Sequence, residues 1–201
     1  MVNSFFCVFY FNLWKKNCIF ILRILKNGDW LHENHQSSKG VYLIFYRVNS
    51  GFESMRWEEA VQVALCYGWI DSIVRKMDDD RRKQAFGPRK ENSTWSKVNK
   101  IYVEKLILEN VMHESGLKKI ETAKQNGSWE LLDNVENLII PEDLQKAFDN
   151  NPPAFHNYKN FSFHYQKSYL YWLNQAKREE TRNSRIGEII RLCNNNCKTR
   201  H

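Results

Sequence analysis

The sequence predicts an α+β protein, with a small antiparallel sheet and helices in the N-terminal two-thirds and an all-helical C-terminal region. Two patterns carry this prediction. Residues 41–46 and the extended stretches after them have the β-branched and aromatic character of strands, whereas apolar residues after about residue 130 recur at helical spacing. The chain has 201 residues, of which 42% are hydrophobic and 26% charged, and this composition excludes a disordered protein.

Each element of the N-terminal part has a local signal. Residues 41–46 (VYLIFY) form an apolar run typical of a buried strand. Ser54 stands where the N-cap of the next helix belongs, Gly68 suits the left-handed position that ends that helix, and Pro88 favours extended backbone before it. The polar run 78–84 is expected to be exposed. The expected order is a helix at 30–35, a strand at 41–46, a helix after residue 54, extended segments at 69–77 and 86–89, and helices at 97–109 and 115–125.

The C-terminal part shows helix signals alone. Pro141 suits a helix start, Tyr169 and Leu173 share an apolar helix face, and residues 151–153 (NPP) are expected to break the chain. Helices are expected at 142–149, from Ser162 onward, and at about 180–193. The predicted division is a divergent N-terminal segment at 1–28, an α+β domain at 29–135 and a helical domain at 136–201.

Charge is segregated along the chain, whose formal net charge is +7. Residues 1–100 carry +6, residues 101–150 carry −5, and the remaining residues carry +6. Because segregated charge attracts partners of opposite sign, we expect an anionic small molecule or a protein partner, with nucleic acid as the alternative. It stays open that the basic faces are only solvated, or that basic and acidic segments pair with each other.

Cysteine use and the N-terminal pattern favour a cytoplasmic protein. Five cysteines without a regular framework are typical of reduced thiols. Cys193 and Cys197 lack the further ligands of a zinc site, so no metal and no other cofactor is expected. Lys15 and Lys16 interrupt the apolar residues 1–25, which leaves no stretch of the ~20 residues that a membrane span needs and no signal-peptide pattern.

The densest group of polar side chains lies between residues 71 and 99. Two arginines lie on extended segments that can pair as a hairpin, and hydroxyl groups cluster at a helix start, where free N–H groups and the helix dipole favour an anion. In the structural alternative, Asp71 pairs with an arginine, the serines cap the helix and Trp95 belongs to the core. The candidate anion-binding residues are Asp71, Arg75, Arg89, Ser93, Trp95, Ser96 and Asn99.

A second basic cluster lies near the turn between the last two predicted helices. It consists of Lys177, Arg178, Arg182 and Arg185. Cations that end one helix, followed by carboxylates that start the next, also match the helix dipoles, which is the structural alternative. No phosphate-binding loop, nucleophile elbow or zinc-protease motif occurs, and the six histidines are scattered, so no catalytic residue is predicted.

Several motifs resemble the YdeI/OmpD-associated family, whose members are also called bacteriocin-protection proteins. The resemblance covers roughly residues 30–193 and leaves out 1–28, which we interpret as a divergent or misassigned start. It implies a role in tolerance of bacteriocins or antimicrobial peptides and association with an outer-membrane protein, and it brings no catalytic residue. The motifs are WLHENH at 30–35, GVYLIFY at 40–46, ALCYGWID at 64–71, FGPR at 86–89 with Ser93, Trp95, Ser96 and Asn99, GSW at 127–129, and YW at 171–172 with AKR at 176–178.

The sequence therefore favours a non-catalytic binding protein that recognises an anionic small molecule or a protein partner through residues 71–99. Two alternatives stay open. A nucleic-acid-binding protein would use both basic regions and stack Trp95 on a base, with an affinity that falls steeply with salt. An enzyme acting on a phosphorylated or carboxylated metabolite would need Asp71 as an acid–base group in a cleft, and an arginine pair that closes off Asp71 would exclude it.

Overall fold

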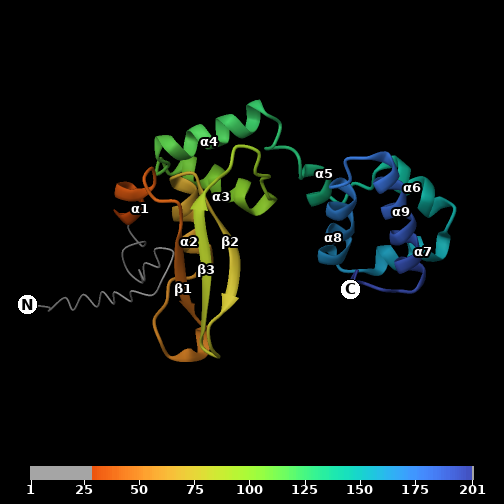
Figure 1. The fold of residues 1–201 in the computed structure, drawn as a ribbon, viewed down its shortest axis with the longest axis horizontal. Coiled ribbons are helices and arrows are strands. Elements are labelled where there is room, and N and C mark those ends of the chain that lie inside the picture. The colour runs from red at the N-terminus through yellow and green to blue at the C-terminus, as the bar shows by residue number, and fades with distance from the viewer. Residues whose placement is uncertain (1–28, 201) are drawn as a thin grey trace, which may run out of the picture. The chain divides into compact units, whose positions relative to one another are not determined.

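The computed structural model describes residues 29–200, which form two compact units (Figure 1). Unit 1 ends at Trp129 and unit 2 begins at Glu130. Unit 1 contains a three-stranded antiparallel sheet with helices, and unit 2 is helical, so the predicted α+β class is confirmed. The segment 1–28, predicted to be a divergent start, lies outside the described residues. Among residues 29–200, no helix combines the length and the hydrophobicity needed to cross a bilayer.

The sheet of unit 1 has the strand order β1-β3-β2. Its strands are β1 (Val41–Tyr46), β2 (Trp69–Lys76) and β3 (Arg81–Pro88). Residues of β1 alternate between buried and half-buried, as expected for a strand with one face on the core. β2 and β3 form a hairpin, and their register shifts between Asp71 and Val74, which marks an irregularity in the edge strand.

The polar run 78–84 contains the hairpin turn and the start of β3, and it is exposed or half-exposed, as expected, except at its last residue. Gln84 points to the core side of the sheet and is only 3% exposed. Its side-chain amide donates to the Asp71 carboxylate, and a hydrogen-bonded amide is the kind of polar group that a core accepts. The expected exposure is wrong for Gln84 alone, because its hydrogen-bond partner Asp71 is distant in sequence.

Helices of unit 1 surround the core face of the sheet. Trp69, Trp95 and Val61 are among its most completely buried side chains. Gly68 has the left-handed conformation (φ 73°) that was predicted to end the second helix. The helices are α1 (Asp29–Asn34), α2 (Trp57–Cys66), α3 (Lys97–Leu108) and α4 (Glu114–Gln125).

The start of α2 differs from the prediction that Ser54 is its N-cap. α2 begins at Trp57, and the backbone N–H of the preceding Arg56 donates to the Glu59 carboxylate at 2.9 Å. The Ser54 hydroxyl instead accepts from the backbone N–H of Tyr46 at 3.1 Å. The serine therefore fastens the loop to the end of β1, which leaves it no role at the helix start.

Unit 2 is built from five helices in residues 130–200. Its core includes Phe148, Tyr158, Leu173 and Ile189, all of them fully buried. The helix is interrupted before Pro152, as expected from the motif at 151–153, but a further helix that was not predicted then begins at this proline. Prolines are tolerated in a first turn, where their missing N–H groups have no acceptor to lose. The helices are α5 (Asp133–Glu136), α6 (Glu142–Asp149), α7 (Pro152–Asn160), α8 (Phe163–Asn174) and α9 (Glu179–Asn194).

Candidate functional site

Two of the predicted anion-binding residues, Arg89 and Trp95, are stacked at the end of β3. The backbone N–H of Arg89 donates to the Gly68 carbonyl at 2.9 Å, which fixes the chain where it leaves the sheet. The guanidinium carbon lies 3.7 Å from the centre of the Trp95 ring, and Nη2 donates to the Thr94 carbonyl at 3.0 Å. A cation over a buried indole in this way is held by a cation–π interaction of about 2 kcal/mol.

Arg89 carries a buried charge that has no carboxylate partner. The residue is 4% exposed, its Nε has no hydrogen-bond partner, and within residues 29–200 it forms no ion pair. Burial lowers the pKa of its guanidinium to about 10, and the negative charge of Asp71 opposes that shift. Because desolvating a cation costs several kcal/mol, a buried arginine normally has an anion beside it.

The start of α3 lies next to this stack. Ser96 is the N-cap, and its hydroxyl accepts from the backbone N–H of Asn99 at 3.3 Å, so both residues do what the structural alternative expected. The other N–H groups of the first turn have no acceptor within the helix, and they form the positive end of its dipole. Ser93 is half-buried just before this turn, and Lys97 is exposed in it.

Trp129 continues the stack, although it was not among the predicted site residues. The centres of its ring and that of Trp95 are 4.9 Å apart. The Nζ atoms of Lys100 and Lys124 lie 5.2 and 5.3 Å from the centre of the Trp129 ring. The sequence contained the signal, since the motif GSW includes this tryptophan, but its distance from residues 71–99 along the chain hid the contact. We call Arg89, Ser93, Trp95, Lys97 and Trp129 the α3 site.

Arg75 lies apart from the α3 site. The predicted hairpin exists, but Arg75 pairs with Lys83 near its turn, whereas Arg89 follows the last residue of β3 at the opposite end. Arg89 follows Lys83, the partner of Arg75, by six residues along the chain, which is about 20 Å at about 3.3 Å per residue. The two arginines therefore do not share one anion.

Asp71 lines a cavity of its own. One carboxylate oxygen accepts from the Trp57 indole N–H at 3.0 Å and from the Gln84 amide. The residue is not closed off by an arginine, since it borders a cavity of about 760 Å³ between the start of α2 and the sheet, here called the Asp71 pocket. Neither an indole nor an amide changes its protonation state near neutral pH, so these two contacts give Asp71 no acid–base partner.

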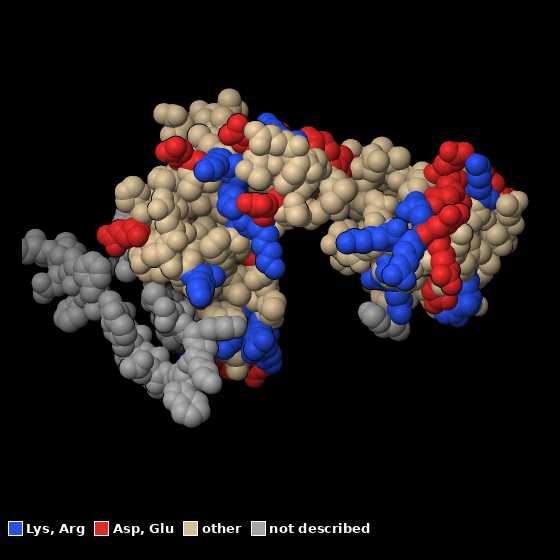
Figure 2. Space-filling view, turned by 45° about the horizontal axis from the view of Figure 1, so that its top comes forward, with Lys and Arg blue, Asp and Glu red and all other residues tan. Residues whose placement is uncertain are grey.

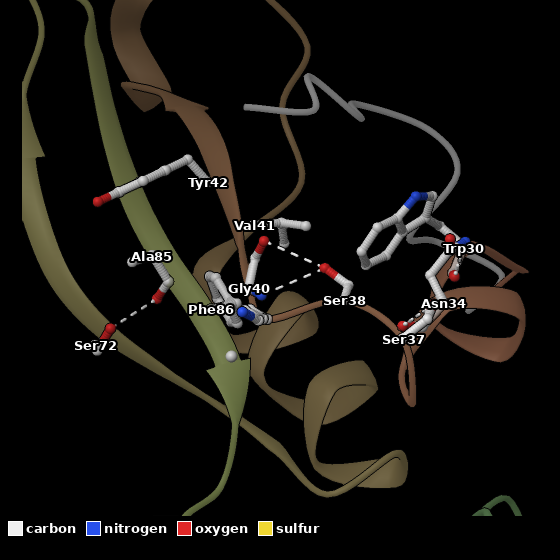
Figure 3. Close-up of a pocket in the computed structure, with 12 residues that line it drawn as sticks. Trp30, Asn34, Ser37, Ser38, Gly40, Val41, Tyr42, Ser72, Ala85 and Phe86 are labelled. Carbon is white, nitrogen blue, oxygen red and sulfur yellow. Dashed lines mark hydrogen bonds between the residues drawn. The ribbon is translucent and has the colours of Figure 1, made fainter. Parts of the chain in front are cut away.

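A second cavity, of about 690 Å³, lies where α1 and the loop after it meet the sheet (Figure 3). Several of its polar groups are already used. The Ser38 hydroxyl accepts from the backbone N–H of Gly40 at 3.3 Å, and the Ser72 hydroxyl donates to the Ala85 carbonyl at 3.4 Å. The Asn34 amide donates to the Trp30 carbonyl at 2.9 Å. None of the predicted anion-binding residues lines this cavity.

The second basic cluster is largely occupied by contacts within unit 2. Arg182 forms a two-pronged ion pair with Asp143, one contact of which is 3.0 Å long. Arg185 lies 5.0 Å from the centre of the Trp172 ring and also donates to the carbonyl of that residue. Lys177 and Arg178 are exposed, and on the face shown in Figure 2 the basic side chains of unit 2 stand beside a band of acidic ones.

Most of the net charge lies outside the described residues. Residues 1–28 contribute +4 of the total of +7, residues 29–129 contribute +2, and residues 130–201 contribute +1. Each described unit is thus close to neutral, with both signs interspersed. In the part of the chain that the structure describes, no three His, Cys, Asp or Glu side chains are placed to hold a metal ion.

In a comparison with known proteins, the two parts of the chain match two different protein families. Residues 137–196 match the family described as "Bacteriocin-protection, YdeI or OmpD-Associated", and residues 25–119 match a domain of unknown function (DUF8412). A relative is the uncharacterized protein YdeI of Bacillus subtilis (strain 168), which is 31% identical over 83 residues. That alignment covers 41% of this chain and 42% of the relative. No solved structure gave a significant match.

These matches bear on the resemblance seen in the motifs. The match to the YdeI/OmpD-associated family lies within unit 2, whereas the match to the domain of unknown function covers the described part of unit 1 as far as residue 119. Four residues of the α3 site lie within the match to the domain of unknown function, namely Arg89, Ser93, Trp95 and Lys97. Trp129 lies outside both matches. The match of residues 137–196 to the YdeI/OmpD-associated family, together with the relative named YdeI, thus supports the resemblance seen in the motifs.

Proposed function

We propose that this chain is a non-catalytic binding protein whose α3 site recognises the phosphate or carboxylate group of a small molecule or a protein partner. One observation carries the proposal, namely the buried guanidinium of Arg89, which forms no ion pair within residues 29–200 and has an Nε without a hydrogen-bond partner there. The charge is held at the start of α3, where the helix dipole adds to it. An anion bound at this point lowers the cost of keeping Arg89 charged and buried.

The groups that we propose bind this anion lie at the start of α3. Backbone N–H groups of the first turn of α3 point outward, as they do wherever helix starts bind anions. Ser93, which is half-buried, precedes this turn in the chain, and the exposed Lys97 lies in it. Trp129, with Lys100 and Lys124 against its ring, provides an aromatic surface for the remainder of the ligand. Arg89 itself acts through its charge, since it is too buried to meet the ligand.

The nucleic-acid alternative has weaker support. Each described unit has a net charge of only +1 or +2, and the residues of the second basic cluster are partly paired with Asp143 and Trp172. Binding through counterion release needs several free cations along one surface. A single anionic group is therefore the better match to the α3 site.

Inorganic phosphate and pyrophosphate test the proposal, by calorimetric titration of the full chain at about 50 and about 200 mM salt. We expect binding that Arg89→Met weakens at least tenfold and Lys97→Ala about threefold, because the first loses the buried charge and the second an exposed one. Lys118→Ala, an exposed lysine on α4, is the matched control and leaves the affinity unchanged. Equal affinity of the Arg89→Met variant, once shown to be folded, would contradict the proposal.

The family name suggests the biological setting, and we propose that anion recognition serves tolerance of bacteriocins or antimicrobial peptides. The test is survival of a bacteriocin-sensitive strain that expresses the chain. We expect higher survival with the natural chain than with the Arg89→Met variant at equal protein levels. Equal survival of the two strains would separate the α3 site from that role, even where phosphate binding is intact.

A further inference from the structure

We propose that protonation of a histidine cluster releases α1, with the loop after it, from the rest of unit 1, and so opens the cavity shown in Figure 3 as the pH falls. The released segment, residues 30–39, is here called the α1 strap. The histidine cluster consists of His32, His35, Tyr67 and His113. It shares no residue with the α3 site, so this device is separate from the proposed function.

The rings of the histidine cluster come from three parts of unit 1 and lie in contact. His32 is on α1 and His35 just after it, Tyr67 follows α2, and His113 is the N-cap of α4. The centre of the His113 ring is 4.7 Å from that of His35 and 5.9 Å from that of His32. Tyr67 stacks on His113, with 5.0 Å between the ring centres. Because histidine gains its charge between about pH 8 and about pH 5, acid places like charges side by side here.

The His35 ring is held in one tautomer. Its Nδ1 lies 2.8 Å from the Leu31 carbonyl oxygen, which can only accept a hydrogen bond, so Nδ1 carries the hydrogen and Nε2 the lone pair. Nε2 is buried and has no hydrogen-bond partner within residues 29–200. A proton added to the ring therefore forms a buried N–H without an acceptor, and water supplies that acceptor only when the α1 strap moves away.

The charges around the histidine cluster do not compensate for added protons. Burial and the charges of the other two histidines lower the pKa of His113, and Glu114 opposes that shift. Once the α1 strap has left, this pKa returns towards 6.5, so the released form binds the proton more readily and acid favours it. The carboxylates nearby are exposed, and solvent screens them. The other titratable and charged groups on the surrounding elements are Glu33, Cys66, Glu109, Glu114 and Lys119.

The α1 strap depends on contacts of its side chains with the rest of unit 1. The backbone N–H groups of His35, Ser37 and Ser38 donate to carbonyls of the same segment. Leu31 is 2% exposed in the core, and the Trp69 indole N–H donates to the His35 carbonyl at 3.1 Å. A helix of six residues is not stable on its own in water. When His35 turns towards solvent, the bond from Trp69 is weakened with it, and little else holds the helix in place.

Release of the α1 strap changes the cavity of about 690 Å³ (Figure 3). Trp30 and Asn34 of α1, with Ser37 and Ser38 after it, border this cavity. Trp30 also lies edge-on to the buried Trp69, with 6.0 Å between the ring centres. Departure of these side chains opens the cavity to solvent and exposes apolar core that Leu31 and Trp30 cover at neutral pH.

The test is amide hydrogen exchange of the full chain, read by mass spectrometry at about pH 7.5 and about pH 5.5, with exchange times scaled for the effect of pH on the chemical rate. We expect the protection of peptides from the α1 strap to fall at least about tenfold in acid, while that of α2 and β3 changes less than about twofold. Unchanged protection of the α1 strap would overturn the proposal. An equal loss throughout unit 1 would overturn it too, since it would mean global unfolding.

Variants show whether the histidines are responsible. The double variant His35→Gln/His113→Asn has amides that form hydrogen bonds but do not titrate, so its α1 strap should keep the same protection at both pH values. His164→Gln, which changes an exposed histidine of α8, is the matched control and should behave like the natural chain. Each protein is compared with itself between the two pH values, so a weaker strap at neutral pH does not affect the result. Acid release that persists in the double variant would overturn the proposal.

NMR titration of the histidine ring protons gives a second readout, on the natural chain, that does not depend on the folding of the double variant. We expect the protonation midpoints of His35 and His113 to coincide with the pH at which the α1 strap loses protection. Midpoints that lie apart from that pH would show that other groups drive the release, and the proposal would fail.

Discussion

Gly116 of α4 lies against the backbone carbonyl of Cys66 at the end of α2, so closely that a Cβ at position 116 would stand 2.2 Å from that oxygen. The carbonyl oxygen of Leu65 would be 2.8 Å away. Both neighbours are backbone atoms of a helix and cannot turn aside as a flexible side chain can. This contact sets the distance between α2 and α4, whose ends are also joined by the His113 N–H, which donates to the Cys66 carbonyl at 3.1 Å.

We therefore expect Gly116→Ala to lower the free energy of unfolding by about 3 kcal/mol, because the two helices must separate to admit one methyl group. Urea unfolding followed by tryptophan fluorescence measures the change. Gly187→Ala is the control: it lies within α9, nothing is within 4 Å of its added Cβ, and it should stabilise unit 2 by about 0.5–1 kcal/mol through helix propensity. A loss at position 116 no larger than the usual effect of a surface substitution would contradict the close contact.

His113 predicts how the stability of unit 1 depends on pH. Burial, together with the charges of His35 and His32, lowers the pKa of His113 below its ordinary value of 6.5. Its Nδ1 also accepts from the Ser115 backbone N–H at 3.2 Å, which only the neutral ring can do. Since the unfolded chain binds the proton more readily, stability is fully present above about pH 6.5 and is lost as the pH falls through the lower, folded value.

The measurement is the urea midpoint of unit 1 between pH 8 and pH 5. His113→Asn keeps an N-cap acceptor but cannot titrate, so its midpoint should fall less steeply with acid than that of the natural chain. Parallel pH profiles of the two proteins would show that His113 has no part in the dependence.

In unit 2, the pair between Arg182 of α9 and Asp143 of α6 is the best-defined contact of the second basic cluster. The hydrogen bond from Arg182 lowers the pKa of Asp143, so this stabilisation is present at neutral pH and is lost in acid. Both side chains are partly exposed, and we expect a coupling of about 1 kcal/mol between Arg182→Met and Asp143→Asn in a double-mutant cycle of urea unfolding. Additive single effects would indicate that solvent screens the pair fully.

Local signals explain which parts of the fold could be predicted. Residues 41–46 form a strand with the predicted bounds, because every residue of the run favours extended backbone and burial. The helix after Pro141 has its predicted bounds, and Ser96 caps α3 as expected. Each of these features depends on neighbours within a few residues, which a sequence shows directly.

The features that could not be predicted depend on distant partners. Gln84 is buried only because Asp71 accepts from it, and Trp129 belongs to the α3 site only because α4 carries it back to Trp95. The hairpin was expected, but its register decides that Arg75 and Arg89 lie at opposite ends. The residue types thus indicated which chemistry a site could perform. Contacts between distant parts of the chain, such as strand pairing, decided which residues lie together in that site.

The cysteines give a prediction that involves both units. Burial raises the pKa of the Cys66 thiol to about 11 and that of the Cys193 thiol to about 12, whereas Cys197 is exposed. Because the thiolate is the reactive form, we expect iodoacetamide at neutral pH to label Cys197 in the folded protein and to reach Cys66 and Cys193 only in denaturant. Mass spectrometry of the labelled peptides distinguishes these sites.

The Gly116→Ala variant tests whether labelling of Cys66 depends on the contact between α4 and the end of α2. Its substitution loosens the contact between α4 and Cys66 without touching unit 2, so labelling of Cys66 should become faster while labelling of Cys193 stays as slow as before. Rapid labelling of Cys66 in the natural chain would show that the end of α2 opens readily and would contradict its burial. Equal acceleration of both thiols would mean that the two units unfold together, since a local opening at α4 exposes only the first.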